Sequence, residues 1–232
     1  MENQYFTVGL VIADKDEYVH LDKFLEPDAA AVSIQGLVGH TFTVKGKTQN
    51  IRVRTICTGI GKVNATVGAT LLAEGSDMLL SAGLSGGFDE TSKNDIVLGT
   101  RFYEHDFDLT TIGYELSQKS HNDKPIVSAC ELNSDIVKKF PFVKQGVFVT
   151  GDCFISSKEK HDFLKKTFNP IACDMESAAV GYVASVFDLP FVSLRMVSDG
   201  ANDDSAKAYA DTLGCDTADL WLKIVFDWIK SL

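Results

Sequence analysis

The chain has 232 residues, of which 45% are hydrophobic and 23% are charged, values close to those of an average soluble globular protein. This composition excludes a disordered or collagen-like protein, and the length predicts a single domain over residues 1–232. The net charge of -10, from 22 basic and 32 acidic residues, argues against nucleic acid or an anionic membrane as a partner.

The N-terminus and the cysteines predict a cytoplasmic protein. The chain begins MENQYF, which lacks the basic and apolar regions of a signal peptide, and no apolar run reaches the roughly 20 residues that span a bilayer. An odd number of cysteines without a CxxC pair is typical of free thiols in a reducing compartment. We expect all five to be buried: Cys57, Cys130, Cys153, Cys173 and Cys215.

Strand-forming and helix-forming segments alternate along the first half of the chain. The polar residues 45–47 predict a hairpin turn, and the glycine-rich residues 83–87 are expected to form a turn that ends a buried strand. The expected strands are 6–12, 40–45, 49–57 and 78–82, and the expected helices are 14–24 and 62–74.

The second half continues the same pattern. Its expected strands are 95–100, 143–150, 170–173 and 191–197, and its expected helices are 158–167, 176–187 and 217–231. This alternation predicts an α/β fold with a central sheet flanked by helices, mostly parallel but made mixed by the hairpin. Ligands bind such sheets at the carboxyl ends of the strands, so the residues that follow each strand are the candidates for a site.

Acidic residues follow the first strand, at Asp14, Asp16 and Glu17. They are either first-turn acids that the helix dipole favours, or one of them faces the edge of the sheet as a general base. Asp14 in particular either caps the helix or enters a pocket. In both cases three acids make a poor phosphate site.

Glycines follow two further strands, at 59–61 and 83–87. They either turn the chain or let the backbone approach a ligand in a shared cleft, and neither segment matches a P-loop or a complete dinucleotide fingerprint. His105, Asp106 and Asp108 are potential metal ligands, but the other histidines lack ligand spacing. We therefore expect hydrogen bonding there and no metal site.

The later strand ends carry an aromatic residue and three charged ones. Phe154 either packs in the core or stacks on a flat heterocycle. Glu176 is either a first-turn acid or a semi-buried carboxylate that binds sugar hydroxyls. Arg195 and Asp199 either form an ion pair that ends the strand, or Asp199 is a carboxylic acid with a raised pKa that donates a proton.

Taken in order, these segments resemble the purine nucleoside phosphorylase and nucleosidase superfamily, most closely its bacterial 5'-methylthioadenosine/S-adenosylhomocysteine nucleosidases. Each segment is weak alone, but the ordered set covers nearly the whole chain and is specific. The resemblance implies a nucleoside phosphorylase-like fold and a homodimer in which the neighbouring subunit helps to close the pocket for the 5'-group. The matching segments are 9–11 with Glu17, 59–63, 85–87, 105–108, 113–115, 151–155, 175–176 and 195–199.

The resemblance also implies a reaction, the hydrolysis of the N-ribosidic bond of 5'-methylthioadenosine and S-adenosylhomocysteine, with 5'-deoxyadenosine as a further candidate. Adenine and the thioribose sugar would be released without a metal or an organic cofactor. In this comparison Asp199 matches the acid that protonates N7 of adenine, with Ser198 orienting it. Glu17 matches the carboxylate that activates water, and Arg195 matches a residue near that water.

The remaining matched residues would bind the substrate. Glu176 matches the acceptor for the ribose hydroxyls, with Met175 packed under the sugar. Phe154 matches the residue that stacks on adenine, and the backbone of Ile155 matches the group that pairs with the base edge. The positions expected around the 5'-alkylthio group are Ile60, Leu109, Ile112 and Tyr209.

Two positions depart from the family pattern, and two other functions compete with hydrolysis. Leu84 stands where a serine commonly helps to hold the water, and Asp14 replaces an apolar residue. A nucleoside phosphorylase would need cations around phosphate, whereas the end of the first strand is acidic and the glycine-rich segments carry no arginine. A non-catalytic nucleoside-binding protein would need neither Glu17 nor Asp199.

Overall fold

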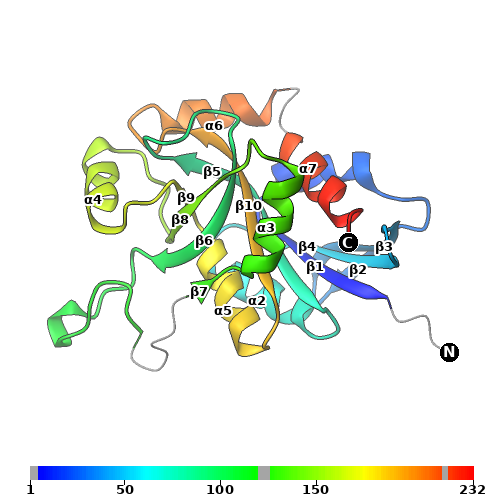
Figure 1. Ribbon diagram of the computed structural model, residues 1–232. Helices are drawn as coiled ribbons and strands as arrows, with labels where there is room; N and C mark the ends of the chain where they lie inside the picture. Colours follow the sequence, from blue (N-terminus) through cyan, green and yellow to red (C-terminus); the bar gives the residue numbers. More distant parts are fainter. Residues whose placement is uncertain (1–4, 120–125, 216–218) are drawn as a thin grey trace.

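The computed structural model describes residues 5–119, 126–215 and 219–232, which form a mixed sheet with helices on both sides (Figure 1). The strands are β1 (Phe6–Ile12), β2 (Ala30–Ile34), β3 (Leu37–Lys45), β4 (Asn50–Cys57), β5 (Met78–Gly87), β6 (Ile96–Glu104), β7 (Ile126–Val127), β8 (Lys144–Thr150), β9 (Ala172–Asp174) and β10 (Phe191–Asp199). The helices are α1 (Lys15–Tyr18), α2 (Lys62–Ala73), α3 (Cys130–Lys139), α4 (Lys158–Phe168), α5 (Ser177–Val186), α6 (Ser205–Leu213) and α7 (Leu220–Ile229), with 3-10 turns η1 (Val19–Phe24) and η2 (Thr110–Ile112).

The strand order is β10-β6-β8-β9-β5-β1-β4-β3-β2, and β10 also pairs with β5. Strands β5, β10, β6, β8 and β9 therefore form a closed ring of pairings, while β1 to β4 extend the sheet outward from β5. β1, β4, β5 and β10 run parallel, and the β3–β4 hairpin is antiparallel as predicted. The sheet is not mostly parallel, however, because β10–β6, β5–β9, β2–β3 and β6–β7 are also antiparallel pairs. The carboxyl ends of the parallel strands meet on one side of the molecule.

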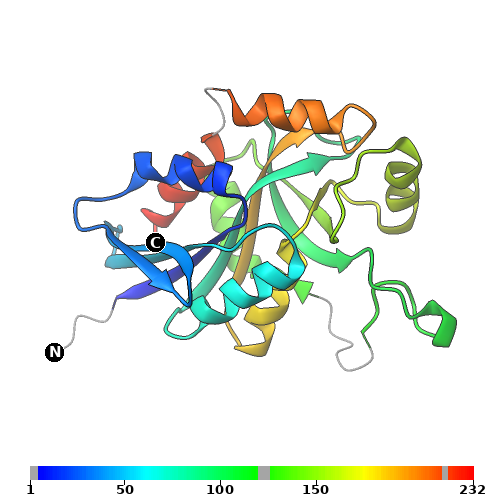
Figure 2. The same ribbon diagram turned by 180° about the vertical axis from the view of Figure 1, so that it is seen from behind.

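Both faces of the sheet carry apolar side chains, and helices therefore cover both faces. One face packs against α3, η1 and α7 through residues such as Ile136, Leu21 and Trp221. The other packs against α2 and α5 through residues such as Leu72 and Val180. Figures 1 and 2 show these two sets of helices in front of the sheet in opposite views. No helix among the described residues is both long and apolar enough to cross a bilayer.

The structure corrects the expected turn at residues 83–87. β5 continues through this segment to Gly87, because it pairs with β10 as far as Gly86 and with β9 at Gly86 and Gly87. Close approach, and not a turn, is what requires glycine: a Cβ at Gly83 would collide with Glu17 Oε2, and one at Gly86 would lie 2.8 Å from Cys173 Sγ.

Other expectations hold with changed limits or fail. The helix expected over 14–24 is divided into α1 and the 3-10 turn η1, and the start of the helix expected over 217–231 lies outside the described residues. Cys153 and Cys215 are exposed, not buried, and the side chain of Cys130 lies outside the described part of the chain. The sequence interpretation missed β2, β7, α3 and α6.

Candidate active site

A cavity lies at the carboxyl ends of β1, β5, β9 and β10, as the strand-end rule predicts, and encloses about 670 Å³ out to its open mouth. Helix α6 crosses the end of the sheet at which β10 finishes, and it contributes one wall (Figure 1). Ten of the twelve residues predicted to form the site line this cavity: Glu17, Ile60, Phe154, Ile155, Met175, Glu176, Arg195, Ser198, Asp199 and Tyr209.

Glu17 enters the cavity from α1 and is buried. Its Oε1 accepts a hydrogen bond of 3.2 Å from the backbone N–H of Leu84, and its Oε2 has no hydrogen-bond partner among the described residues. Burial raises the pKa of Glu17 to about 8, against the opposing effect of the Arg195 guanidinium, and the negative charge of Glu176 adds to the rise. The carboxyl group is therefore able to exchange a proton near neutral pH.

Arg195 is buried within β10 and is held by two carboxylates. Its Nε lies 3.2 Å from Asp174 Oδ2 and its Nη2 lies 3.4 Å from Glu176 Oε2, while Nη2 also donates to Ser81 Oγ at 2.9 Å. Burial disfavours the cation, but Asp174 and Glu176 outweigh it and raise the pKa of Arg195. The ion pair considered between Arg195 and Asp199 is not formed among the described contacts.

Glu176 lies where β9 passes into α5, and the backbone N–H of Gly61 donates to its Oε1 at 3.0 Å. Gly61 has a φ of 101°, a backbone conformation that favours glycine, and this explains the glycine pair before α2. Burial raises the pKa of Glu176, although Arg195 acts in the opposite direction. The two segments bring a carboxylate and a glycine turn, 115 residues apart, into one wall.

Asp174 is a functional residue that the sequence interpretation did not assign. Its Oδ1 accepts hydrogen bonds from Thr150 Oγ1 at 2.7 Å and from the backbone N–H of Glu176 and Ser177 at 3.2 and 3.1 Å. The bonds to Glu176 and Ser177 hold the start of α5 in place, and the contact of Asp174 with Arg195 holds the guanidinium. An aspartate just before a helix is a recognisable capping signal, and it could have identified this residue.

Asp199 ends β10 and is buried. The Ser198 hydroxyl donates to its Oδ2 at 2.7 Å, and the backbone N–H of Ala201 donates to its Oδ1 at 2.9 Å. Ser198 Oγ also lies 3.1 Å from the carbonyl oxygen of Ser85, to which it can donate instead. The hydroxyl can therefore serve Asp199 in either protonation state, as a donor to the carboxylate or as an acceptor from the acid.

Asp14 takes both of the roles that were considered for it. Its Oδ1 accepts from the backbone N–H of Asp16 at 2.9 Å and caps α1, while its Oδ2 accepts from the Tyr209 hydroxyl at 2.7 Å. The rings of Tyr209 and Phe154 pack edge to face, with their centroids 5.8 Å apart. Burial, with Glu17 and Asp14 nearby, raises the pKa of Tyr209, so its hydroxyl stays protonated as a donor.

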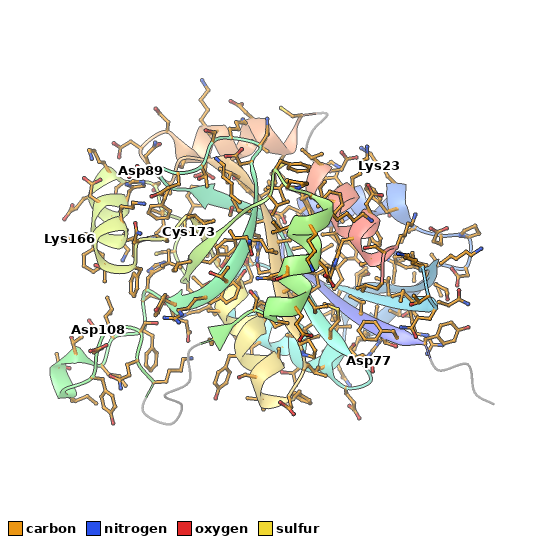
Figure 3. The ribbon with its side chains drawn as sticks, viewed as in Figure 1. Lys23, Asp77, Asp89, Asp108, Lys166 and Cys173 are labelled. Atoms are coloured by element: carbon orange, nitrogen blue, oxygen red, sulfur yellow. The ribbon has the colours of Figure 1, made fainter. Side chains whose placement is uncertain are left out.

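Some predicted contacts are not brought into the cavity. Leu109 and Ile112 do not line it, and Ile112 is 68% exposed. They lie near Asp108 on a segment that projects from the body of the protein (Figure 3). Asp106 accepts hydrogen bonds from Lys62 Nζ at 2.7 Å and from the backbone N–H of Asp152 at 2.8 Å, as expected for this cluster, whereas the two buried ring nitrogens of His105 have no hydrogen-bond partner among the described residues.

Six further residues line the cavity, namely Ala13, Leu84, Ser85, Gly86, Cys153 and Cys173. Cys173 is buried between β9 and the glycines of β5, inside the molecule (Figure 3). Burial raises the pKa of its thiol, with the charge of Asp199 adding to the effect, so Cys173 acts as a small apolar wall residue.

Comparison with known proteins identifies the family. A model described as the Phosphorylase superfamily matches residues 7–223. A 5'-methylthioadenosine/S-adenosylhomocysteine nucleosidase from Shewanella piezotolerans is 34% identical over 211 residues, covering 86% of this chain and 88% of the relative.

Solved structures agree with this assignment. The 5'-methylthioadenosine/S-adenosylhomocysteine nucleosidase of Helicobacter pylori matches with a TM-score of 0.90 and 26% identity, over 99% of this chain and all of that chain (100%). The futalosine hydrolase of the same species matches with a TM-score of 0.83 and 26% identity, over 95% and 97% of the two chains. The chain therefore belongs to the phosphorylase superfamily and, within it, to the 5'-methylthioadenosine/S-adenosylhomocysteine nucleosidases.

Proposed function

We propose that the protein is a nucleosidase that hydrolyses the N-ribosidic bond of 5'-methylthioadenosine and S-adenosylhomocysteine, with 5'-deoxyadenosine as a further substrate. The observation that carries the proposal is the convergence of three buried carboxyl groups, those of Glu17, Glu176 and Asp199, on one cavity. The names of the relatives support the choice of substrates. A protein that only bound nucleosides would not need two additional buried acids.

The leaving base would be handled by Asp199 and its neighbours. Cleavage of the bond between C1' and N9 leaves the electron pair on adenine, and protonated Asp199 donates its proton to N7. The hydroxyl of Ser198 and the N–H of Ala201 hold this carboxyl group in place during the transfer. Phe154 provides a ring for stacking on adenine, and Ile155 provides backbone groups for the base edge.

The sugar and the water would be handled by the opposite wall. Glu176 accepts hydrogen bonds from the ribose hydroxyls above Met175, and its charge stabilises the positive charge that develops on the sugar. Ionised Glu17 takes a proton from the water that attacks C1'. Arg195, fixed by Asp174 and Glu176, stands beside Glu17 and keeps the pKa of that carboxyl from rising further.

The charges of the cavity favour water over phosphate as the nucleophile. Arg195 is the one basic residue among the described residues of the wall, and its guanidinium is already paired with two carboxylates. The acidic residues of the wall are Asp14, Glu17, Asp174, Glu176 and Asp199. A phosphate dianion would meet strong repulsion in a buried site of this composition, so we assign hydrolysis and not phosphorolysis.

An assay of base release, with the freed purine identified by chromatography, tests the proposal. Purified protein would be given 5'-methylthioadenosine, S-adenosylhomocysteine, 5'-deoxyadenosine and, because a structural neighbour is a futalosine hydrolase, futalosine. We expect adenine and free 5-methylthioribose from the first substrate, at a rate that does not depend on phosphate. Sugar 1-phosphate as the product, or cleavage of futalosine alone, would contradict the proposal.

The assembly and location of the protein are part of the same proposal. Three apolar side chains on the outside of α2 and the turn before it, Ile60, Val63 and Val67, are 48%, 74% and 49% exposed, and Ile60 also lines the cavity. This surface supports a homodimer whose interface adjoins the cavity mouth.

The four cysteines whose state is described are free thiols, which supports a cytoplasmic location. The match over residues 7–223 supports one domain over 1–232.

A further inference from the structure

The cavity wall carries one acidic group for which the proposed reaction has no use, the carboxylate of Asp14. It accepts hydrogen bonds from the backbone N–H of Asp16 at Oδ1 and from the Tyr209 hydroxyl at Oδ2, which leaves about two of its four lone-pair positions free. In the part of the chain that the structure describes, no lysine or arginine forms an ion pair with it. The protein therefore does not neutralise the charge of Asp14.

Tyr209 connects this carboxylate to the place of the substrate. Its ring packs against Phe154, the proposed partner of adenine, and its hydroxyl extends from there to Asp14. The negative charges of Glu17 and Glu176 contribute to the raised pKa of Tyr209, so the hydroxyl lies near the residues that serve the sugar. The base, C1' and the ribose hydroxyls already have partners in the proposed reaction. The 5'-substituent is the part of the substrate that remains for Asp14 and Tyr209.

The pair of Asp14 and Tyr209 can accept hydrogen bonds from a ligand but has none to donate. The Tyr209 hydroxyl uses its hydrogen on Asp14, and a carboxylate is only an acceptor. A methylthio group has no donor hydrogen, so it would displace water from both acceptors without replacing the lost hydrogen bonds. An ammonium group supplies donors and an opposite charge, and such charge-assisted hydrogen bonds are about twice as strong as neutral ones.

We propose that Asp14, held in place by Tyr209, selects substrates whose 5'-substituent carries an ammonium group, an inference that rests on the proposed nucleosidase function. Of the proposed substrates, S-adenosylhomocysteine carries an ammonium group on its 5'-thio chain and 5'-methylthioadenosine does not. Asp14 binds this group and exchanges no proton with the substrate. The surplus of acidic over basic residues in the cavity wall favours a cation in the same way.

A matched pair of substrates tests the selection. In 5'-(2-aminoethylthio)-5'-deoxyadenosine an ammonium group stands where 5'-propylthio-5'-deoxyadenosine has a methyl group, and neither compound carries the carboxylate of S-adenosylhomocysteine. At neutral pH the wild type should have a kcat/KM roughly tenfold to 100-fold higher for the amine, as expected for a hydrogen bond to a charged group. A wild type that prefers the propylthio compound, or that has no preference, overturns the proposal without the use of any variant.

Asp14→Asn assigns the preference to its residue. Asparagine keeps an oxygen that caps α1 but removes the charge, so the preference for the amine should fall to about threefold or less. The control is Asp16→Asn, because Asp16 is an exposed acid of the same turn that does not line the cavity. The control should keep the wild-type preference. Full preference in Asp14→Asn, or an equal loss in Asp16→Asn, would show that the selection does not come from Asp14.

The same measurements separate this inference from the proposed function. If the wild type releases no adenine from either compound or from 5'-methylthioadenosine, the nucleosidase function itself is wrong. If it releases adenine from both compounds with equal kcat/KM, the function stands and only the selection by Asp14 is wrong.

Discussion

The Glu17 carboxyl is the residue whose behaviour the structure predicts most directly. Because its pKa is raised to about 8 and a general base works in the ionised form, kcat/KM should increase with pH through the region near 8. Glu176 contributes to that raised pKa through its negative charge, so Glu176→Gln should move the ascending limb to lower pH while it lowers the rate. A pH profile of kcat/KM for the wild type and the variant checks this. If the ascending limb lay at the same pH in both proteins, the charge of Glu176 would not influence the pKa of Glu17.

The same pKa predicts how stability depends on pH. Glu17 has a higher pKa in the folded protein than its ordinary value of 4.5, so its contribution to stability is complete below about 4.5 and is lost as pH rises through about 8. Glu17→Gln removes this loss. The variant should gain on the order of 1–3 kcal/mol over the wild type at pH 8.5, and little at pH 4.5, in thermal unfolding. An equal difference at the two pH values would show that burial does not perturb the carboxyl.

Asp199 is the proposed acid, and Asp199→Asn keeps its shape while it removes the transferable proton. We expect kcat to fall by about 10²- to 10⁴-fold, with substrate binding retained. Rapid-quench measurement of adenine release, together with calorimetric titration of the substrate, separates the two effects. A variant that kept more than about a tenth of the wild-type kcat would need another proton donor.

The residues of the site were largely predictable, but their mutual support was not. The strand-end rule and the family resemblance together selected twelve residues, and all but Leu109 and Ile112 line the cavity. The sequence interpretation missed Asp174 because its role depends on Arg195, which follows it by 21 positions on another strand of the ring. Contacts between distant strands are not encoded in local spacing.

At the level of elements, β5 shows why local rules failed. Five residues that include three glycines favour a turn by composition, since glycine weakens strands. The strand continues because β10 and β9 pair with it, and neither partner is near it in the sequence. By contrast, the β3–β4 hairpin and helices α2, α4 and α5 were predictable, since their signals lie within each segment.

The glycine at the middle of β5 gives a test at the level of this element. A Cβ at Gly83 would collide with Glu17 Oε2, so Gly83→Ala should displace the carboxylate, reduce kcat more than tenfold and destabilise the fold by about 1–3 kcal/mol. Gly214→Ala is the control, because Gly214 has a φ of -85° and its nearest neighbour would be 3.9 Å away. If Gly83→Ala kept full activity, the packing of Glu17 against β5 would not matter for catalysis.

For the whole molecule, the exposed surface of α2 predicts assembly. Val63→Asp introduces a charge at a side chain that is 74% exposed, so it should leave the monomer folded and weaken the proposed dimer. Val38→Asp, at a 58% exposed residue of β3, should leave the assembly unchanged. Sedimentation of the three proteins provides the measurement. A monomeric and fully active wild type would contradict the homodimer.

The place of β10 in the sheet has a consequence for protein synthesis. β10 is the last strand in the chain, yet it is paired on both edges, with β5 and β6, and it carries Arg195, Ser198 and Asp199. A nascent chain on the ribosome therefore holds β5 and β6 with open edges until its C-terminal part emerges. Such edges invite pairing with other chains. Prematurely terminated products should consequently aggregate instead of retaining partial activity.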